Sequence, residues 1–177
     1  MGYGNDASNA KKLALGGVLL ALTVTAVFFA VLLPASKLSL YALSSFFVSI
    51  VIIESGAKYG WMFYIASCIL SFVIVQEKTG AVPFLTFFGI YGIIKYYAEK
   101  IANIVIEYVL KLIYFNINLA SAFLLAKQFV PGLLQVGFPL YLTVIGFEAA
   151  FIVYDYVYTL FIKYYRTRLR DMLKIGR

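Results

Sequence analysis

The stretch LALGGVLLALTVTAVFFAVLL, from Leu13 to Leu33, contains no charged residue and is followed by Pro34. A helix needs about 20 apolar residues to cross the hydrocarbon core of a bilayer, so this stretch is long enough to span a membrane. The apolar core of a secretory signal peptide is shorter, about 7–15 residues, and more apolar stretches follow here. We therefore interpret residues 13–33 as a retained transmembrane helix.

The composition of the whole chain points to the same class. Of its 177 residues, 63% are hydrophobic and 13% are charged, and the formal net charge is +7. A soluble domain of this size could not cover so much apolar surface, and a disordered chain would be far less hydrophobic. Histidine is absent and Cys68 is the single cysteine, which excludes a disulfide framework and removes the commonest metal ligand.

The apolar runs predict an all-α integral membrane protein in which residues 1–177 form one transmembrane helical domain. The runs are continuously apolar and lack the alternation that a membrane β-barrel requires. The six expected spans are 13–33, 38–53, 59–75, 81–97, 101–129 and 133–165. The second run is short, so an arrangement of five spans with a re-entrant hairpin at residues 38–53 stays open. We expect residues 1–10 to be mobile and residues 166–177 to form a basic cytoplasmic tail.

The distribution of lysine and arginine predicts the orientation, because cytoplasmic segments are enriched in these residues. With both termini in the cytoplasm, the inner segments hold twelve basic residues and the outer loops hold three, Lys37, Lys78 and Lys127. This orientation predicts a multi-pass protein of the cell membrane. The basic tail anchors the topology or binds anionic lipid or an acidic partner.

Charged side chains inside two spans predict a structural ion pair. Asp155 in the last span and Lys111 in the fifth lie at similar depths, about 10–12 Å from the inner boundary. A charge buried without its partner would cost several kcal/mol, so we expect Lys111 and Asp155 to pair. Three further pairs have the i,i+4 spacing of a helix: Glu54–Lys58, Lys95–Glu99 and Glu107–Lys111. We expect the first to cap a surface turn, and Lys95, Glu99 and Lys100 to lie at the inner interface.

A second polar group lies higher in the same two spans and is the candidate substrate-binding site. Tyr141, Glu148 and Asp155 recur every seven residues and therefore share one helix face. Glu148 and Asn116 each lie about 20 Å above the inner boundary. We expect Asn116, Asn118, Tyr141 and Glu148 to meet in the outer half of the bundle, where they would form either a structural cluster or a pocket for one small polar solute with aromatic walls.

The first span has small residues at the spacing that lets two membrane helices approach closely, namely Gly17–Ala21 and Ala26–Ala30. This face either packs within the chain or binds another membrane subunit. Signatures of hydrolases, metalloproteases, nucleotide-binding loops and redox sites are absent from the sequence. We therefore expect no enzymatic activity, no catalytic residue, no metal, no cofactor and no nucleic-acid partner.

The pattern resembles the substrate-binding S components of energy-coupling factor (ECF) transporters. The features that carry the resemblance are Lys11-Lys12 before a charge-free first span and the stretch from Glu54 to Gly60 between the second and third spans. The resemblance implies that Gly17 and Ala21 contact a transmembrane coupling subunit, which in turn works with ATPase subunits. It also implies a solute held near the outer face, which here corresponds to Asn116, Asn118, Tyr141 and Glu148. The rod-shape protein MreD and YybS-like proteins have a similar size and helix pattern.

Two functions follow as hypotheses. The first is a membrane subunit of an ECF-type transporter that binds a vitamin-like or amino-acid-like solute in the outer half of the bundle. The alternative is a membrane scaffold without a solute, which recruits partner proteins through its first helix and its basic tail.

Overall fold

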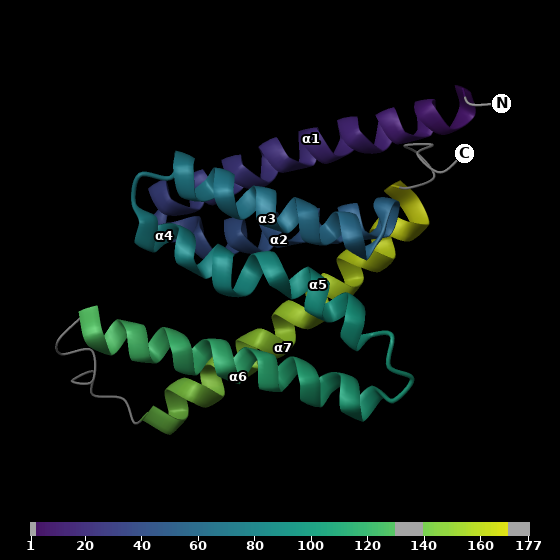
Figure 1. Ribbon diagram of the computed structural model, residues 1–177. Coiled ribbons are helices and arrows are strands. Elements are labelled where there is room, and N and C mark those ends of the chain that lie inside the picture. Colours follow the sequence, from purple (N-terminus) through teal and green to yellow (C-terminus); the bar gives the residue numbers. More distant parts are fainter. Residues whose placement is uncertain (1–2, 130–139, 170–177) are drawn as a thin grey trace. The chain divides into compact units, whose positions relative to one another are not determined.

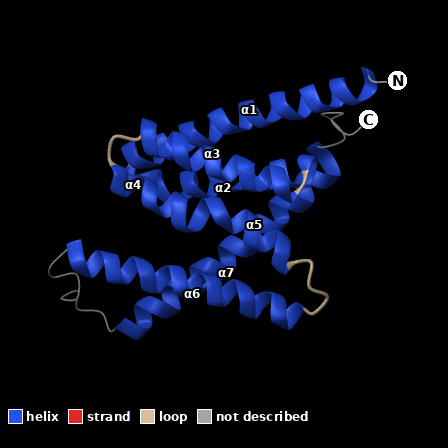
Figure 2. Cartoon of the chain, viewed as in Figure 1, coloured by secondary structure: helices blue, strands red, loops and turns tan. Residues whose placement is uncertain are grey.

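The computed structural model describes the backbone of residues 3–129 and 140–169 and the side chains of residues 10–124 and 141–168. Within these ranges every regular element is a helix (Figure 2). The long helices are α1 (Tyr3–Leu32), α2 (Lys37–Ser55), α3 (Ala57–Ile74), α6 (Ile104–Phe129) and α7 (Leu140–Tyr164). Two shorter helices, α4 (Lys78–Pro83) and α5 (Gly89–Ala98), are joined by the π-helical segment η2 (Phe84–Phe88). The segments η1 (Pro34–Ser36) and η4 (Tyr165–Leu169) are the remaining elements in the described ranges.

Among the described residues, six helical segments are long and apolar enough to cross a membrane, as the sequence predicts. They are residues 10–32, 34–55, 57–74, 78–98, 104–124 and 141–168. The second candidate is one continuous helix of 19 residues, α2, preceded by η1, so it is not a re-entrant hairpin. Residues 133–139, where the sequence predicts the start of the last span, lie outside the described residues.

The chain divides into two compact units. Unit 1 contains residues 1–96 and 160–177, and unit 2 contains residues 97–159. Unit 1 therefore holds the first three spans, nearly all of the fourth and the end of the last one. Unit 2 holds α6 and most of α7. All four residues of the predicted solute site lie on these two helices.

Unit 1 has two apolar core clusters that define its two ends. The first cluster joins the first half of α1, the end of α2, the start of α3 and the first residue of η4, with Leu19, Val51, Phe63 and Tyr165 among its members. The second joins the opposite ends of α1, α2 and α3 to α4, around Val27, Tyr41, Val75 and Ala81. The helices of unit 1 therefore run alternately up and down, and the start of α1 lies at the same end as the last turns of α7 (Figure 1).

Gly56 separates α2 from α3. Its φ of 94° lies in the left-handed region that favours glycine, and its N–H donates to the carbonyl of Ile52. The prediction that Glu54 and Lys58 pair at the surface is wrong, because the Lys58 side chain has no ion pair among the described residues. The i,i+4 spacing requires a continuous helix, and the left-handed residue between the two charges interrupts it.

The fourth span contains a local irregularity at Pro83, which lacks a backbone N–H and disrupts the regular helix. The π-helical segment η2 follows immediately. The Tyr64 hydroxyl of α3 donates to the carbonyl of Leu85 at 2.6 Å, and the Thr86 hydroxyl donates to the carbonyl of Val82 at 2.9 Å. A neighbouring helix therefore satisfies a backbone group in the segment where the regular bonding pattern changes.

The helix of the fifth span begins at Ile104, three residues later than the sequence predicts. Asn103 is its N-cap residue, because its side-chain oxygen accepts a hydrogen bond from the N–H of Val105 at 3.0 Å. An asparagine in this place stops the helix from extending back to Ile101 and fixes the depth of the polar residues that follow.

Candidate functional site

The predicted pair of Lys111 and Asp155 is present in unit 2. The Lys111 ammonium lies 3.2 Å from the Asp155 carboxylate on the facing helix, and the Lys111 side chain is 2% exposed. The i,i+4 partner Glu107 lies closer, at 2.6 Å, and Glu99 lies at 3.7 Å. We call these four residues the Lys111 cluster. One buried ammonium therefore joins α6 to α7 and to the loop that precedes α6.

A small cavity adjoins the Lys111 cluster. It has a volume of about 90 Å³ and is lined by Tyr108, Lys111, Leu112, Phe151, Ile152 and Asp155. The ammonium also lies 5.5 Å from the centre of the Tyr108 ring, within the range of a cation–π contact. Sites for small organic ligands have volumes of about 300–1,000 Å³, so this space fits water or an ion and not a vitamin-like solute. The arrangement supports the structural interpretation of the Lys111–Asp155 pair.

Two of the four residues of the predicted solute site, Asn116 and Glu148, contact each other. The amide nitrogen of Asn116 lies 3.4 Å from the Glu148 carboxylate and 3.0 Å from the carbonyl of Leu112. This contact joins α6 to α7 at a second level, as the matched depths of the two residues predict. Asn118 instead donates to the carbonyl of Tyr114 on its own helix, at 2.9 Å.

The aromatic residues around Asn116 and Glu148 do not form a closed wall among the described side chains. Tyr141 is 64% exposed, and Phe147 is also exposed. Phe115 stacks on Phe151, with ring centres 4.5 Å apart, and fills the space between α6 and α7. Glu148 itself is half-buried. Asn116 and Glu148 are thus placed to bind a polar group together, and the α6–α7 pair alone leaves them open on one side.

The small residues of α1 divide into two sets. Ala26 and Ala30 are buried inside unit 1, so this pair packs within the chain. Gly17 and Ala21 are exposed, and no atom lies within 4 Å of the place that a Cβ of Gly17 would occupy. Packing within the chain is therefore observed for Ala26 and Ala30, whereas the binding of another membrane subunit at the exposed Gly17 and Ala21 stays a prediction.

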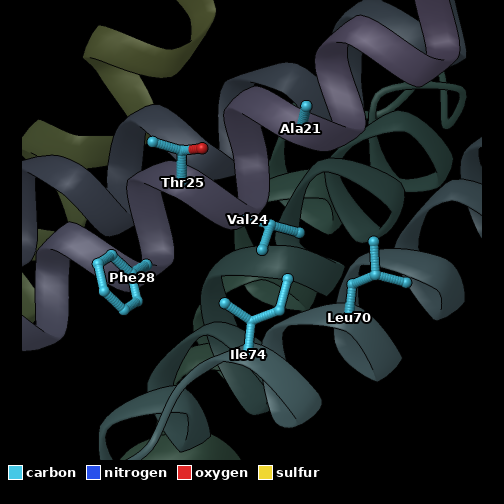
Figure 3. Close-up of a pocket in the computed structure, with 6 residues that line it drawn as sticks. All are labelled: Ala21, Val24, Thr25, Phe28, Leu70 and Ile74. Carbon is cyan, nitrogen blue, oxygen red and sulfur yellow. The ribbon is translucent and has the colours of Figure 1, made fainter.

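An open apolar groove adjoins the exposed Ala21. It has a volume of about 360 Å³ and lies between α1 and α3, as Figure 3 shows. Its lining residues are Ala21, Val24, Thr25, Phe28, Leu70 and Ile74. In a bilayer, a groove of this kind accommodates a lipid chain or the side chains of another membrane helix. Ala21 belongs to both the groove and the exposed small face.

Lys95 does not lie at the inner interface, where the sequence predicts it. Lys95 is 0% exposed, whereas its position near the end of the fourth span predicts a side chain at the interface. A charged residue near a helix end can be directed inward by its neighbours, which the sequence of one helix does not reveal. Among the described residues, no group of three or more potential ligands is arranged to hold a metal ion.

Comparison with known proteins identifies no relative. No family model, no curated protein and no solved structure matches the chain. The resemblance to ECF S components therefore rests on the sequence pattern alone.

Proposed function

We propose that the chain is the substrate-binding subunit of an ECF-type transporter in a bacterial cell membrane. The observation that carries the proposal is the contact between Asn116 on α6 and Glu148 on α7. Ionisable residues within a membrane span are costly, and their default interpretation is functional. Nothing in the sequence matches a nucleotide-binding loop, so the energy for release would come from partner ATPase subunits.

The chemistry of the two side chains defines the solute class. A carboxylate attracts a cationic or amino group, and a neutral amide both donates and accepts hydrogen bonds. Glu148 and Asn116 would therefore orient a small amino-acid-like or vitamin-like solute. Tyr141 and Asn118 would add contacts from the same two helices, and partner subunits would complete the enclosure.

The charges at the two ends of unit 1 support one orientation in the membrane. The end with the start of α1 and the last turns of α7 carries six exposed or half-exposed cations, whereas the opposite end carries Lys37 and Lys78. By the positive-inside rule, both termini face the cytoplasm. Asn116 and Glu148 then lie in the outer half of the membrane, where a solute arrives.

Mass spectrometry of small molecules released from the purified protein tests the proposal. We expect a retained solute with an amino or cationic group. Glu148→Ala should abolish its retention, and Glu148→Gln should keep the hydrogen bond but weaken retention about tenfold or more. Glu77→Ala, which removes an exposed acid of unit 1, is the control and should retain the solute. Equal retention by Glu148→Ala and the wild-type protein would remove this assignment.

A scaffold without a solute is the second candidate function. It is favoured by the exposure of Tyr141 and Asn116, which leaves the polar contact open, and by the free face of α1 at Gly17 and Ala21. Both functions need a partner on this face. Ala21→Leu should fill the groove and reduce co-purification of partner membrane proteins. Leu22→Phe, about 100° away around the helix, adds similar bulk outside the groove and should have no effect. A stable partner with no retained solute would favour the scaffold.

A further inference from the structure

Six basic side chains gather at one end of unit 1. They come from the start of α1, the first turn of α3 and the last turns of α7 and η4, and they are Lys11, Lys12, Lys58, Lys163, Arg166 and Arg168. We call these six residues the basic end. The three segments lie together because Leu15, Phe63 and Tyr165 belong to one core cluster (Figure 1).

The six side chains have no partner within the part of the chain that the structure describes. None of them forms an ion pair or a side-chain hydrogen bond there. Lys78 at the opposite end contrasts with them, because its ammonium donates to the carbonyls of Phe72 and Val75 at the end of α3. Lys111 in unit 2 also contrasts, because three carboxylates surround it. The charges of the basic end are therefore available to an external anion.

Exposed aromatic rings accompany these cations. Tyr59 and Trp61 lie in the first turns of α3, next to Lys58, and Tyr164 lies next to Lys163. Tyrosine and tryptophan prefer the level of the lipid headgroups, where one side of the ring is apolar and the other is hydrated. The combination of unpaired cations and aromatic rings is typical of a surface in contact with headgroups.

We infer that the basic end binds the phosphate groups of anionic phospholipids in the adjacent leaflet. The lipid phosphates would supply the negative charges that these six cations do not meet among the described residues. Each lysine or arginine close to an anionic membrane surface increases association about fivefold. The basic end would thus enrich anionic lipid around this end of the protein, whether or not α6 and α7 hold a solute.

Trp61 makes the inference measurable, because it is the single tryptophan of the chain. The full chain is reconstituted in phosphatidylcholine bilayers that contain increasing amounts of brominated phosphatidylglycerol, and quenching of Trp61 fluorescence gives the relative association of the two lipids. We expect a preference of about fivefold or more for phosphatidylglycerol. The triple variant Lys58→Gln, Arg166→Gln, Arg168→Gln should lose most of it, whereas Lys37→Gln at the opposite end should keep it.

Salt and competitors separate the possible sources of the anion. The preference should vanish at about 1 M salt, where charges are screened beyond about 3 Å. Millimolar inorganic phosphate should not displace the lipid. Equal quenching by both lipids in the wild-type protein, or an unchanged preference in the triple variant, would overturn the inference. Displacement by inorganic phosphate or by polyglutamate at low concentration would also overturn it, in favour of a free anion or an acidic protein.

Discussion

Lys111 connects α6 to α7 through a buried charge. Its ammonium is buried and contacts Glu99, Glu107 and Asp155. Removing one carboxylate leaves the ammonium with the other two, whereas removing the ammonium leaves three acids together without a counter-charge. Removing the Lys111 ammonium should therefore cost more than removing the Asp155 carboxylate, although both substitutions break the Lys111–Asp155 pair.

Lys111→Met should destabilise the protein by about 3–5 kcal/mol, because it leaves the buried Asp155 carboxylate without a counter-charge and next to the less buried Glu107. Asp155→Asn should cost clearly less. Thermal unfolding in detergent, followed by size-exclusion chromatography, measures both. Lys58→Met is the matched control, since Lys58 is exposed and has no ion pair among the described residues, and it should change stability by less than about 0.5 kcal/mol. Equal melting temperatures for Lys111→Met and the control would contradict the role of the cluster.

The residue contacts that the sequence predicts correctly are those between helices at matched depth. Lys111 meets Asp155 and Asn116 meets Glu148, because the members of each pair lie at similar depths from the inner boundary. The prediction that fails concerns the direction of a side chain. Lys95 is buried instead of lying at the inner interface, because the direction of a side chain depends on neighbouring side chains that spacing does not specify.

At the scale of elements, glycines set how closely the helices of unit 1 approach. A Cβ placed on Gly80 of α4 would lie 2.6 Å from Cγ2 of Val31 on α1. The carbonyl of Gly80 also accepts a hydrogen bond from the Tyr41 hydroxyl of α2. One residue of α4 therefore contacts two other helices, and a larger residue there would force them apart.

Gly80→Ala should destabilise unit 1 by about 1–3 kcal/mol, because the branched Val31 side chain has little freedom to move. The cost should largely disappear in a Val31→Ala background, and thermal unfolding of the four proteins of this double-mutant cycle measures the difference. Gly16→Ala is the control. No atom lies within 4 Å of the position of its Cβ, so it should be neutral or stabilising. An additive cycle would show that Gly80 and Val31 do not constrain each other.

The boundaries of the elements illustrate what a hydropathy pattern omits. The pattern predicts six apolar segments, and the part of the chain that the structure describes contains six helical segments of sufficient length. It does not predict that α6 begins after the cap at Asn103 or that η2 follows Pro83. These features depend on local hydrogen bonds of single side chains, such as that from Tyr64 to the carbonyl of Leu85, which average hydrophobicity does not report.

At the scale of the whole molecule, the central question is which ends of the helices face the cytoplasm. The alternating helices of unit 1 place the turn between α2 and α3 at the basic end and the connection between α3 and α4 at the other. If all six candidate helices cross the membrane, the loop between α5 and α6 faces the same side as the turn between α2 and α3. The positive-inside rule assigns that side to the cytoplasm.

Cysteine labelling tests this arrangement in intact cells, in a Cys68→Ala background that removes the single native thiol. A membrane-impermeant maleimide should react with Gln76→Cys from outside, because Gln76 is exposed in the connection between α3 and α4. Lys58→Cys and Ala102→Cys should react only after the membrane is permeabilised. Reaction of all three from outside would contradict the six-span topology. The reverse pattern would invert the orientation and place Asn116 and Glu148 in the inner half of the membrane, where a solute arriving from outside could not reach them first.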